Sequence, residues 1–124
     1  MPADIHVSVV IPVYNKWELT EACLRSLHLT LPDGRCEVIV VDNASTDATP
    51  SSCPALGEAL FGDLFRYRSM ERNINFGPAS NLGAREARGE FLLFVDADDE
   101  LAPTFLEKTV GALEADPGAS FAFT

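Results

Sequence analysis

Features that define several common protein classes are missing from this 124-residue sequence. No apolar run approaches the ~20 residues that a membrane-spanning helix needs. The first residues, MPADIHVSVV, lack the charged start and the small-residue cleavage site of a signal peptide. The cysteines Cys23, Cys36 and Cys53 form no CxxC pair, and no pair of histidines lies nearby, which disfavours a zinc site or a disulfide framework. We therefore expect a cytoplasmic protein with reduced thiols.

Positive charge is scarce as well. The sequence has 9 Lys and Arg against 19 Asp and Glu, and its net charge is −10. Nucleic acid is therefore excluded as an expected partner, because a phosphate backbone requires a basic surface. An anionic small molecule remains compatible with the composition only if a metal ion or backbone N–H groups offset the repulsion.

Glycine-rich phosphate-binding motifs are also missing. The sequence contains neither GxGxxG nor GxxxxGK[ST], so it has no Rossmann dinucleotide fingerprint and no P-loop. If the ligand carries phosphate groups, a cation has to hold them. At 124 residues with 47% hydrophobic residues, the chain is long enough for one ordered domain.

Apolar runs alternate with segments of helical spacing. Strands are predicted at 7–14, 36–42, 65–69 and 90–96, and a further strand is predicted to begin at 120–124. Helices are predicted at 16–29, from about residue 46, at 78–88 with Pro78 in first position, and at 103–116 with Pro103 at the start. Alternation of this kind predicts an α/β fold, a doubly wound and mainly parallel sheet with helices on both faces.

The inward faces of these elements follow from their spacing. The inward face of the helix at 16–29 is predicted to carry Leu19, Ala22, Cys23, Ser26 and Leu27. In the helix at 103–116, Leu106, Val110 and Leu113 are predicted to point inward. The first, second and fourth strand runs are continuously apolar, which is typical of strands covered on both faces.

Polar residues follow each clear strand. The first run ends in Tyr14-Asn15, the second in Asp42-Asn43 and the fourth in Asp96-Ala97-Asp98. Because the carboxyl ends of parallel strands meet at one edge of a sheet, these residues are predicted to share one binding crevice.

Helix capping is the alternative explanation for some of these polar groups. Ser45 and Asp47 have the character of caps for the helix from about residue 46. Asp99 and Glu100 precede the helix at 103–116, where the positive end of the helix dipole favours negative charge.

Asp96 and Asp98 are better explained as ligands of a cation. With one residue between them in a bend, their carboxylates can address one ion, and hard oxygen ligands suit Mg²⁺, Mn²⁺ or Ca²⁺. Asp42 has a different expected role, because a carboxylate at a strand end is a good acceptor for a ring N–H or a ribose hydroxyl.

Three segments carry a family resemblance. VSVVIPVYN, EVIVVDNASTD and NINFGPASNLGAREARGEFLLFVDADDEL, in this order and with this spacing, resemble the N-terminal half of the family 2 glycosyltransferases. These are inverting enzymes with a GT-A fold that use nucleotide-diphosphate sugars. The resemblance covers about residues 6–124. It implies that the chain is the donor-binding half of such an enzyme, with the acceptor half absent.

The resemblance also implies roles for individual residues. The segment Pro12-Val13-Tyr14-Asn15 would line the base and ribose pocket, and Asp42 would accept a hydrogen bond from the base, expected to be uracil. Asn43 would lie beside it, and the stretch NINFGPASN, especially Asn75, Gly77 and Asn81, would run along the nucleotide and the donor sugar. Asp96-Ala97-Asp98 resembles the DxD motif, in which Asp98 coordinates Mn²⁺ or Mg²⁺ directly and Asp96 lies near the ribose or a metal-bound water. For Gly77 a turn glycine, and for Asn81 a polar residue on a helix face, remain the alternatives.

The implied reaction transfers a sugar from the nucleotide to an acceptor hydroxyl with inversion. The general base is expected beyond Thr124, so the 124-residue chain should bind nucleotide weakly and transfer little or no sugar. The acceptor, whether glycan, lipid or protein, is left open, and so is association with the inner face of a membrane through segments outside this chain.

Other interpretations remain open at this point. A degenerate transferase domain that binds a nucleotide sugar without catalysis has the same sequence features. A receiver domain would need an Asp at the end of the third strand and a Lys at the end of the fifth, and neither is present. A haloacid-dehalogenase-type phosphatase would carry its DxDx[TV] motif on the first strand, whereas DADDE ends the fourth.

Overall fold

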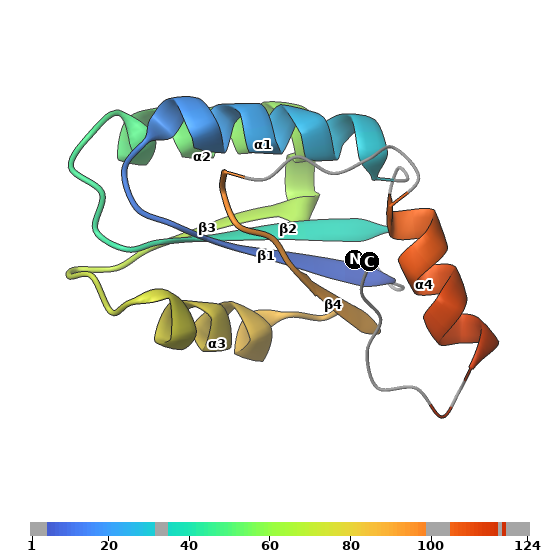
Figure 1. Ribbon diagram of the computed structural model, residues 1–124. Coiled ribbons are helices and arrows are strands. Elements are labelled where there is room, and N and C mark those ends of the chain that lie inside the picture. The colour runs from blue at the N-terminus through green and yellow to red at the C-terminus, as the bar shows by residue number, and fades with distance from the viewer. Residues whose placement is uncertain (1–4, 32–34, 99–104, 117, 119–124) are drawn as a thin grey trace.

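The computed structural model describes residues 5–31, 35–98, 105–116 and 118. Strands and helices alternate along the chain (Figure 1). The strands are β1 (Val7–Val13), β2 (Cys36–Asp42), β3 (Phe65–Ser69) and β4 (Phe91–Phe94). The helices are α1 (Trp17–Thr30), α2 (Thr49–Phe61), the short 3₁₀ turn η1 (Gly62–Leu64), α3 (Phe76–Glu86) and α4 (Phe105–Ala115).

The strands form one four-stranded sheet in the order β3-β2-β1-β4. All its pairings are parallel, with Val9 opposite Val38 on one side and opposite Leu93 on the other. Parallel neighbours require a crossover connection, and the helices between the strands provide it. The predicted parallel α/β sheet is therefore confirmed.

Helices cover both faces of the sheet. In Figure 1, α1 and α2 lie over one face and α3 lies over the other. On the first face, β1 and β2 side chains such as Val9 and Val38 form a buried cluster with Leu24 and Leu27 of α1. On the second face, Ile39 and Val41 pack against Ala79 of α3. The two central strands are buried along their whole length, as their continuous apolar runs predict.

A glycine allows α3 to approach the sheet closely. A Cβ atom placed on Gly83 would lie 2.4 Å from Cγ1 of Val10, so no larger residue fits without a shift. Ala79, one turn earlier on the same helix, is buried as well. These small residues bring the start of α3 within reach of the strand ends.

The fourth strand differs from its prediction. It spans only Phe91–Phe94 rather than 90–96, and its burial alternates. Leu92 and Phe94 are 47% and 52% exposed. The reason is that α3 packs over β1 and β2, so the α3 side of β4 lacks the cover that the apolar run had predicted.

The helices also depart from their predicted boundaries and faces. In α1 the buried residues are Thr20, Cys23, Leu24 and Leu27, whereas Leu19 and Ala22 are exposed. The buried face of α1 therefore differs from the predicted one, since it includes Thr20 and Leu24 but not Leu19 and Ala22. Helix α3 begins at Phe76, which puts Pro78 in third position, still within the first turn where a missing N–H does no harm.

The last helix agrees with the prediction where it can be compared. Val110 of α4 is buried, and Leu113 is partly buried. Pro103, the Leu106 side chain, Asp99, Glu100 and the strand predicted at 120–124 lie outside the described residues. None of the helices in the described part of the chain has the length and apolar character needed to cross a membrane.

A buried carboxylate connects the elements at the amino end of the sheet. Glu37 of β2 is fully buried; it accepts hydrogen bonds from Ser8 Oγ at 2.5 Å and from the Arg88 backbone N–H at 2.7 Å. The Arg66 guanidinium lies 2.9 Å from its other oxygen. Burial acts to raise the pKa of Glu37, but the hydrogen bonds from Ser8, Arg88 and Arg66 and the charge of Arg66 outweigh it and lower that pKa.

We expect Glu37→Gln to destabilise the fold. The substitution leaves Arg66 and Arg88 without their carboxylate, and the free energy of unfolding at pH 7 should fall by about 2–4 kcal/mol. Because the folded-state pKa is lowered, the contribution of Glu37 is present above the ordinary value of 4.5 and is lost as the pH falls through the folded value. Denaturant unfolding at pH 7 and at several pH values below 4.5 measures both effects. The exposed residue Glu71 supplies the control variant Glu71→Gln, and an equal loss in both variants would contradict the role of Glu37.

Candidate functional site

A cleft lies at the carboxyl edge of the sheet. It has a volume of about 650 Å³. It is lined by Pro12, Val13, Tyr14, Asn15, Lys16, Leu19, Thr20, Asn43, Asn73, Asn75, Phe76, Asp96, Ala97 and Asp98. Residues that follow β1, β2 and β4 therefore meet in one place, as the parallel sheet predicts.

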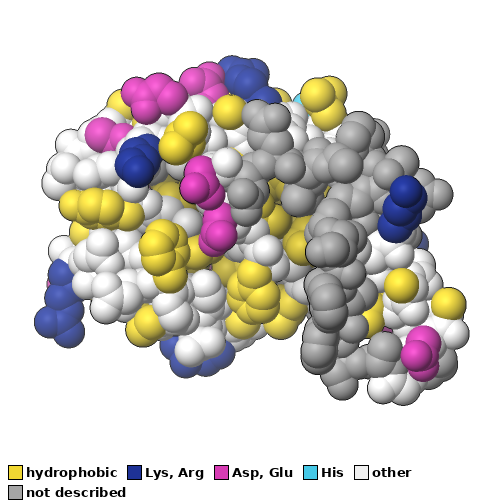
Figure 2. Space-filling view, viewed as in Figure 1, with side chains coloured by type: hydrophobic (Ala, Val, Ile, Leu, Met, Phe, Trp, Pro, Cys, Tyr) yellow, Lys and Arg dark blue, Asp and Glu magenta, His cyan; other side chains and the backbone are white. Residues whose placement is uncertain are grey.

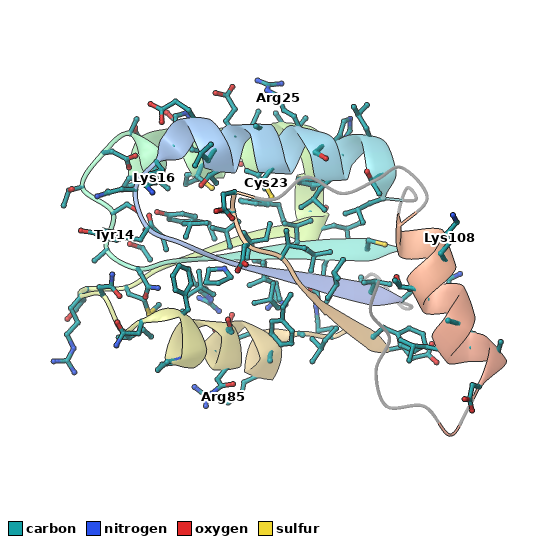
Figure 3. The ribbon with its side chains drawn as sticks, in the orientation of Figure 1. Tyr14, Lys16, Cys23, Arg25, Arg85 and Lys108 are labelled. Carbon is teal, nitrogen blue, oxygen red and sulfur yellow. The ribbon has the colours of Figure 1, made fainter. Side chains whose placement is uncertain are left out.

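The cleft carries both acidic and hydrophobic side chains. Figure 2 shows acidic side chains beside hydrophobic ones in the middle of the face, next to the segment that follows β4. Tyr14 and Phe76 are large apolar side chains that are exposed although they line the cleft. Figure 3 shows Tyr14 and Lys16 extending from the loop between β1 and α1. Aromatic surface next to carboxylates suits a ligand with both a flat ring and a charged group.

Most residues predicted for the site are brought together in this cleft. Among them are the whole segment after β1, from Pro12 to Asn15, the residues Asn43 and Asn75, and the segment from Asp96 to Asp98. Their convergence is an observation, whereas their contacts with a ligand stay predictions.

Three predicted residues are not among those that line the cleft. Asp42 is 0% exposed, and its carboxylate accepts hydrogen bonds from the Tyr67 hydroxyl and the Ser45 N–H inside the fold; its contact with a base stays a prediction. Its neighbour Asn43 lines the cleft instead. Gly77 and Asn81 lie exposed on α3, and their contacts with the nucleotide and the donor sugar stay predictions.

One asparagine joins the loops that follow β1 and β2. The Asn15 side-chain oxygen accepts the backbone N–H of Thr46 at 2.7 Å and that of Asp47 at 3.2 Å. Its own N–H donates to Ser45 Oγ at 2.7 Å. Asn15 and Lys16 have φ angles of 53° and 54°, a left-handed conformation that Asn tolerates better than most residues. The wall of the cleft is therefore held by hydrogen bonds between two loops.

The predicted caps are only partly confirmed. Asp47 Oδ1 accepts the Thr49 N–H at 3.0 Å at the start of α2, as predicted, and Oδ2 also accepts the Trp17 N–H at 2.9 Å at the start of α1. Slight burial acts to raise the pKa of Asp47, but these hydrogen bonds outweigh it and lower that pKa. The prediction for Ser45 is wrong, because its hydroxyl accepts the Asn15 N–H rather than capping α2.

Asp42, which is fully buried, supports the hydrogen bonds between the loops that follow β1 and β2. It accepts the Ser45 N–H at 3.0 Å, and Ser45 in turn holds Asn15. Burial, followed by the hydrogen bond to Asp42, raises the pKa of Tyr67, so the phenol stays protonated and donates at neutral pH. Burial and then the charge of Asp42 raise the pKa of Cys53 to about 12, which keeps that thiol protonated. A chain of hydrogen bonds thus runs from the outer strand β3 to the cleft.

The loop before α3 completes the opposite wall. Asn43 Oδ1 accepts the Ile74 N–H at 3.2 Å, and Asn43 Nδ2 donates to the Asn75 carbonyl oxygen at 3.4 Å. The Asn75 N–H donates to Asn73 Oδ1 at 2.8 Å. Asn75 has φ 70° and ψ 170°, a region that residues other than glycine rarely occupy. This strained backbone is held at the edge of the cleft by two neighbouring asparagines.

Some residues that line the cleft were not predicted individually from the sequence. Leu19 and Thr20 lie in the first turn of α1, and Lys16 is the residue that immediately precedes this helix. The amphipathic pattern had assigned Leu19 to the core, and only the observed rotation of α1 turns it toward the cleft. Asn73 and Phe76 flank Asn75 and belong to the stretch NINFGPASN that the family resemblance had placed along the nucleotide.

The carboxylates of the cleft fit a divalent cation of the Mg²⁺ or Mn²⁺ type. Asp96 and Asp98 are both exposed and both line the cleft. In the described part of the chain, no group of three or more His, Cys, Asp or Glu side chains is placed to hold a metal ion. Mg²⁺ is commonly held by one or two carboxylates, with water and ligand phosphates completing its shell, and the pair meets that requirement.

Comparisons with known proteins give a consistent result. The sequence profile described as Glycosyl transferase family 2 matches residues 8–124. The poly(ribitol-phosphate) beta-glucosyltransferase of Bacillus spizizenii is 40% identical over 100 residues, which cover 75% of this chain and 15% of that protein. The chain spans between 15% and 28% of the length of the first curated relatives that it matches.

Solved structures resemble the fold closely. The mannosyltransferase PcManGT from Pyrobaculum calidifontis, in complex with GDP-Man and Mn²⁺, aligns with a TM-score of 0.84 and 33% identity, over 94% of this chain and 34% of that one. S. aureus TarS 1-349, in complex with UDP-GlcNAc, aligns with a TM-score of 0.79 and 30% identity, over 89% and 31%. The fold thus matches proteins whose structures were solved in complex with nucleotide sugars.

We expect Tyr67→Phe to loosen the cleft wall without unfolding the chain. Loss of the hydroxyl removes one donor from Asp42, so the free energy of unfolding should fall by about 1–2 kcal/mol. The amide resonances of Ser45 and Asn15 should shift in ¹H–¹⁵N spectra. Ser8→Ala is the matched control, because it removes a hydroxyl that donates to Glu37 at the other end of the sheet. If Ser8→Ala shifted the two resonances as much as Tyr67→Phe, the proposed chain of hydrogen bonds would be wrong.

We expect Asn75→Gly to stabilise the fold. Asn75 uses its backbone N–H and carbonyl for its contacts, and glycine keeps both while it relieves the unfavourable φ. The free energy of unfolding should rise by about 0.5–1.5 kcal/mol, and Asn75→Ala should lower it. Thermal and denaturant unfolding of both variants measure the difference. A lower stability for Asn75→Gly than for Asn75→Ala would show that the backbone is not strained.

Proposed function

Since the chain belongs to glycosyl transferase family 2, we propose that its cleft binds the nucleoside diphosphate of a nucleotide sugar together with Mn²⁺ or Mg²⁺. We further propose that residues 1–124 are the donor-binding half of an enzyme that transfers the sugar to an acceptor hydroxyl with inversion. The chain spans a minor part of its relatives, so both statements are proposals about a longer protein. Membership of the family removes the receiver-domain and phosphatase alternatives.

One observation carries the proposal. The exposed aromatic ring of Tyr14 and the exposed carboxylates of Asp96 and Asp98 line the same cleft at the carboxyl edge of a parallel sheet. A nucleoside diphosphate needs both kinds of surface, an apolar one for its base and a cation site for its phosphates. Proteins of similar fold crystallised with UDP-GlcNAc and with GDP-Man support this choice of ligand class.

The residues divide into two groups by their chemistry. Pro12, Val13 and Tyr14 offer an apolar wall for the base, which we propose to be uracil. Asn43 lies in the same cleft with its amide already bonded to the Ile74 N–H and the Asn75 carbonyl, so its orientation is set before a ligand arrives. Asp98 and Asp96 would hold the cation on the side of the cleft that follows β4.

The proposed chemistry divides between a bound cation, the residues of this chain and a general base outside it. The bound cation would stabilise the negative charge that develops on the departing diphosphate. Asp96 and Asp98 hold charge at that position, and the locked loops after β1 and β2 keep the nucleotide oriented. The proton of the acceptor hydroxyl has to be taken by a general base, which we place outside residues 1–124. The acceptor, whether glycan, lipid or protein, is bound there as well in this proposal.

The proposal is tested by titrating UDP into the purified 124-residue chain. Trp17, the single tryptophan, begins α1 next to lining residue Lys16, so its fluorescence should respond. We expect saturable UDP binding with Mn²⁺ or Mg²⁺ and at least about tenfold weaker binding with EDTA, since the cation bridges carboxylate and phosphate. Asp98→Asn should abolish the metal dependence. Asp63→Asn, in the turn before β3, is the control and should bind as the wild type does.

Several results would contradict parts of the proposal. If a folded chain bound neither UDP nor GDP with any metal, the ligand class would be wrong. Tighter binding of GDP than UDP would replace uracil by guanine as the base. Sugar transfer by the 124-residue chain alone, measured with UDP-GlcNAc and GDP-Man as donors, would show that the general base lies within it.

A further inference from the structure

The hydroxyl of Thr20 is buried and has no hydrogen-bond partner among the residues that the structure describes. The residue is 0% exposed. It nevertheless lines the cleft. A buried hydroxyl without a partner destabilises a folded protein, and most buried polar groups are therefore paired. The position of the Thr20 hydroxyl at the cleft suggests that a bound ligand supplies its partner.

Helix geometry does not account for the unpaired hydroxyl. A threonine in a helix can donate to the carbonyl oxygen four residues earlier. Thr30, in the last turn of the same helix, does so and donates to the Ser26 carbonyl at 2.9 Å. Thr20 makes no such bond to the Lys16 carbonyl, which accepts the N–H groups of Leu19 and Thr20. Its hydroxyl is therefore available for another partner.

The neighbours of Thr20 place it beside the acidic pair. Cys23 lies one turn later on the same side of α1, and its sulfur is 4.0 Å from the Asp96 carbonyl oxygen. Figure 3 shows Cys23 pointing from α1 toward the segment after β4. Lys16, the residue that precedes α1, also lines the cleft. Thr20 thus lies between a positive side chain and the segment that carries Asp96 and Asp98.

We propose that the Thr20 hydroxyl donates a hydrogen bond to an oxygen of the diphosphate of the bound nucleotide, with Lys16 beside it as a positive group. This inference rests on the proposed function. Thr20 lines the cleft although it is fully buried, so a change of its Cα–Cβ rotamer, of a kind ordinary for threonine, is the movement that would bring the hydroxyl to a bound oxygen. An apolar residue would fill the same space on the inward face of α1, so packing alone does not call for a hydroxyl there.

The chain contains a matched control for this proposal. Thr49, the first residue of α2, is also fully buried, and its Oγ1 likewise makes no hydrogen bond of normal geometry in the described part of the chain, although it lies near enough to Asp47 to help lower the pKa of that carboxyl. Thr49 is not among the residues that line the cleft. Substitution by valine removes the hydroxyl at either position with little change of volume. Thr20→Val and Thr49→Val therefore make the same chemical change, one inside the cleft and one outside it.

The experiment measures stability and binding on both variants of the 124-residue chain. Both should unfold at a temperature equal to or about 2–6 °C higher than the wild type, because an unpaired buried hydroxyl is removed. Thr20→Val should weaken the binding of UDP with Mn²⁺ by about 3- to 10-fold. Thr49→Val should leave that binding unchanged, and Thr20→Ser, which keeps the hydroxyl, should restore most of the affinity.

The outcomes separate this inference from the proposed function. If the wild type binds UDP and Thr20→Val binds it equally well, the role of Thr20 is overturned and the proposed function stands. A drop in the unfolding temperature of Thr20→Val with unchanged affinity would show that the hydroxyl serves the fold. If the wild type binds no nucleoside diphosphate, the proposed function and this inference fail together.

Discussion

The cleft depends on the hydrogen bonds by which Asn15 joins the loops after β1 and β2. Each loop alone is a short irregular segment with unpaired backbone groups, and such groups need partners wherever water does not reach them. Asn15 accepts two N–H groups of the second loop, while Ser45 and Asp47 of that loop accept N–H groups of the first. Because the bonds are reciprocal, neither loop can move without breaking contacts in the other. The left-handed backbone at Asn15 and Lys16 persists for this reason.

Buried carboxylates stabilise the sheet at both of its ends. At the amino end, Glu37 pairs with two arginines and a serine from three other segments of the chain. At the carboxyl end, Asp42 accepts from Tyr67 and Ser45 and thereby supports the cleft wall. Both residues belong to β2, the strand between β1 and β3. The exposed acids of the cleft differ from these, since Asp96 and Asp98 have room for an external cation while Asp42 does not.

The sequence predicted much of this architecture because the relevant signals are local. Continuous apolar runs mark the two central strands, and alternation with helical spacing predicts parallel pairing. Parallel pairing then brings Tyr14, Asn43 and Asp98 to one edge, since strand direction alone decides where strand ends lie. The short β4 and the rotated face of α1 were mispredicted, because the cover that α3 and the cleft provide depends on segments far away in the sequence.

By itself, the sequence determined the order of the elements, the family and the edge of the sheet at which a ligand site forms. Only the tertiary structure decided which member of a motif faces that site. Asp42 and Asn43 are neighbours at the end of β2, and consecutive side chains of a strand point to opposite faces. Asp42 is bonded to Tyr67 and Ser45 in the interior, while the next residue, Asn43, lines the cleft. The sequence motif alone does not predict which of the two residues lines the cleft. That difference arises from the packing of helices and strands around the sheet.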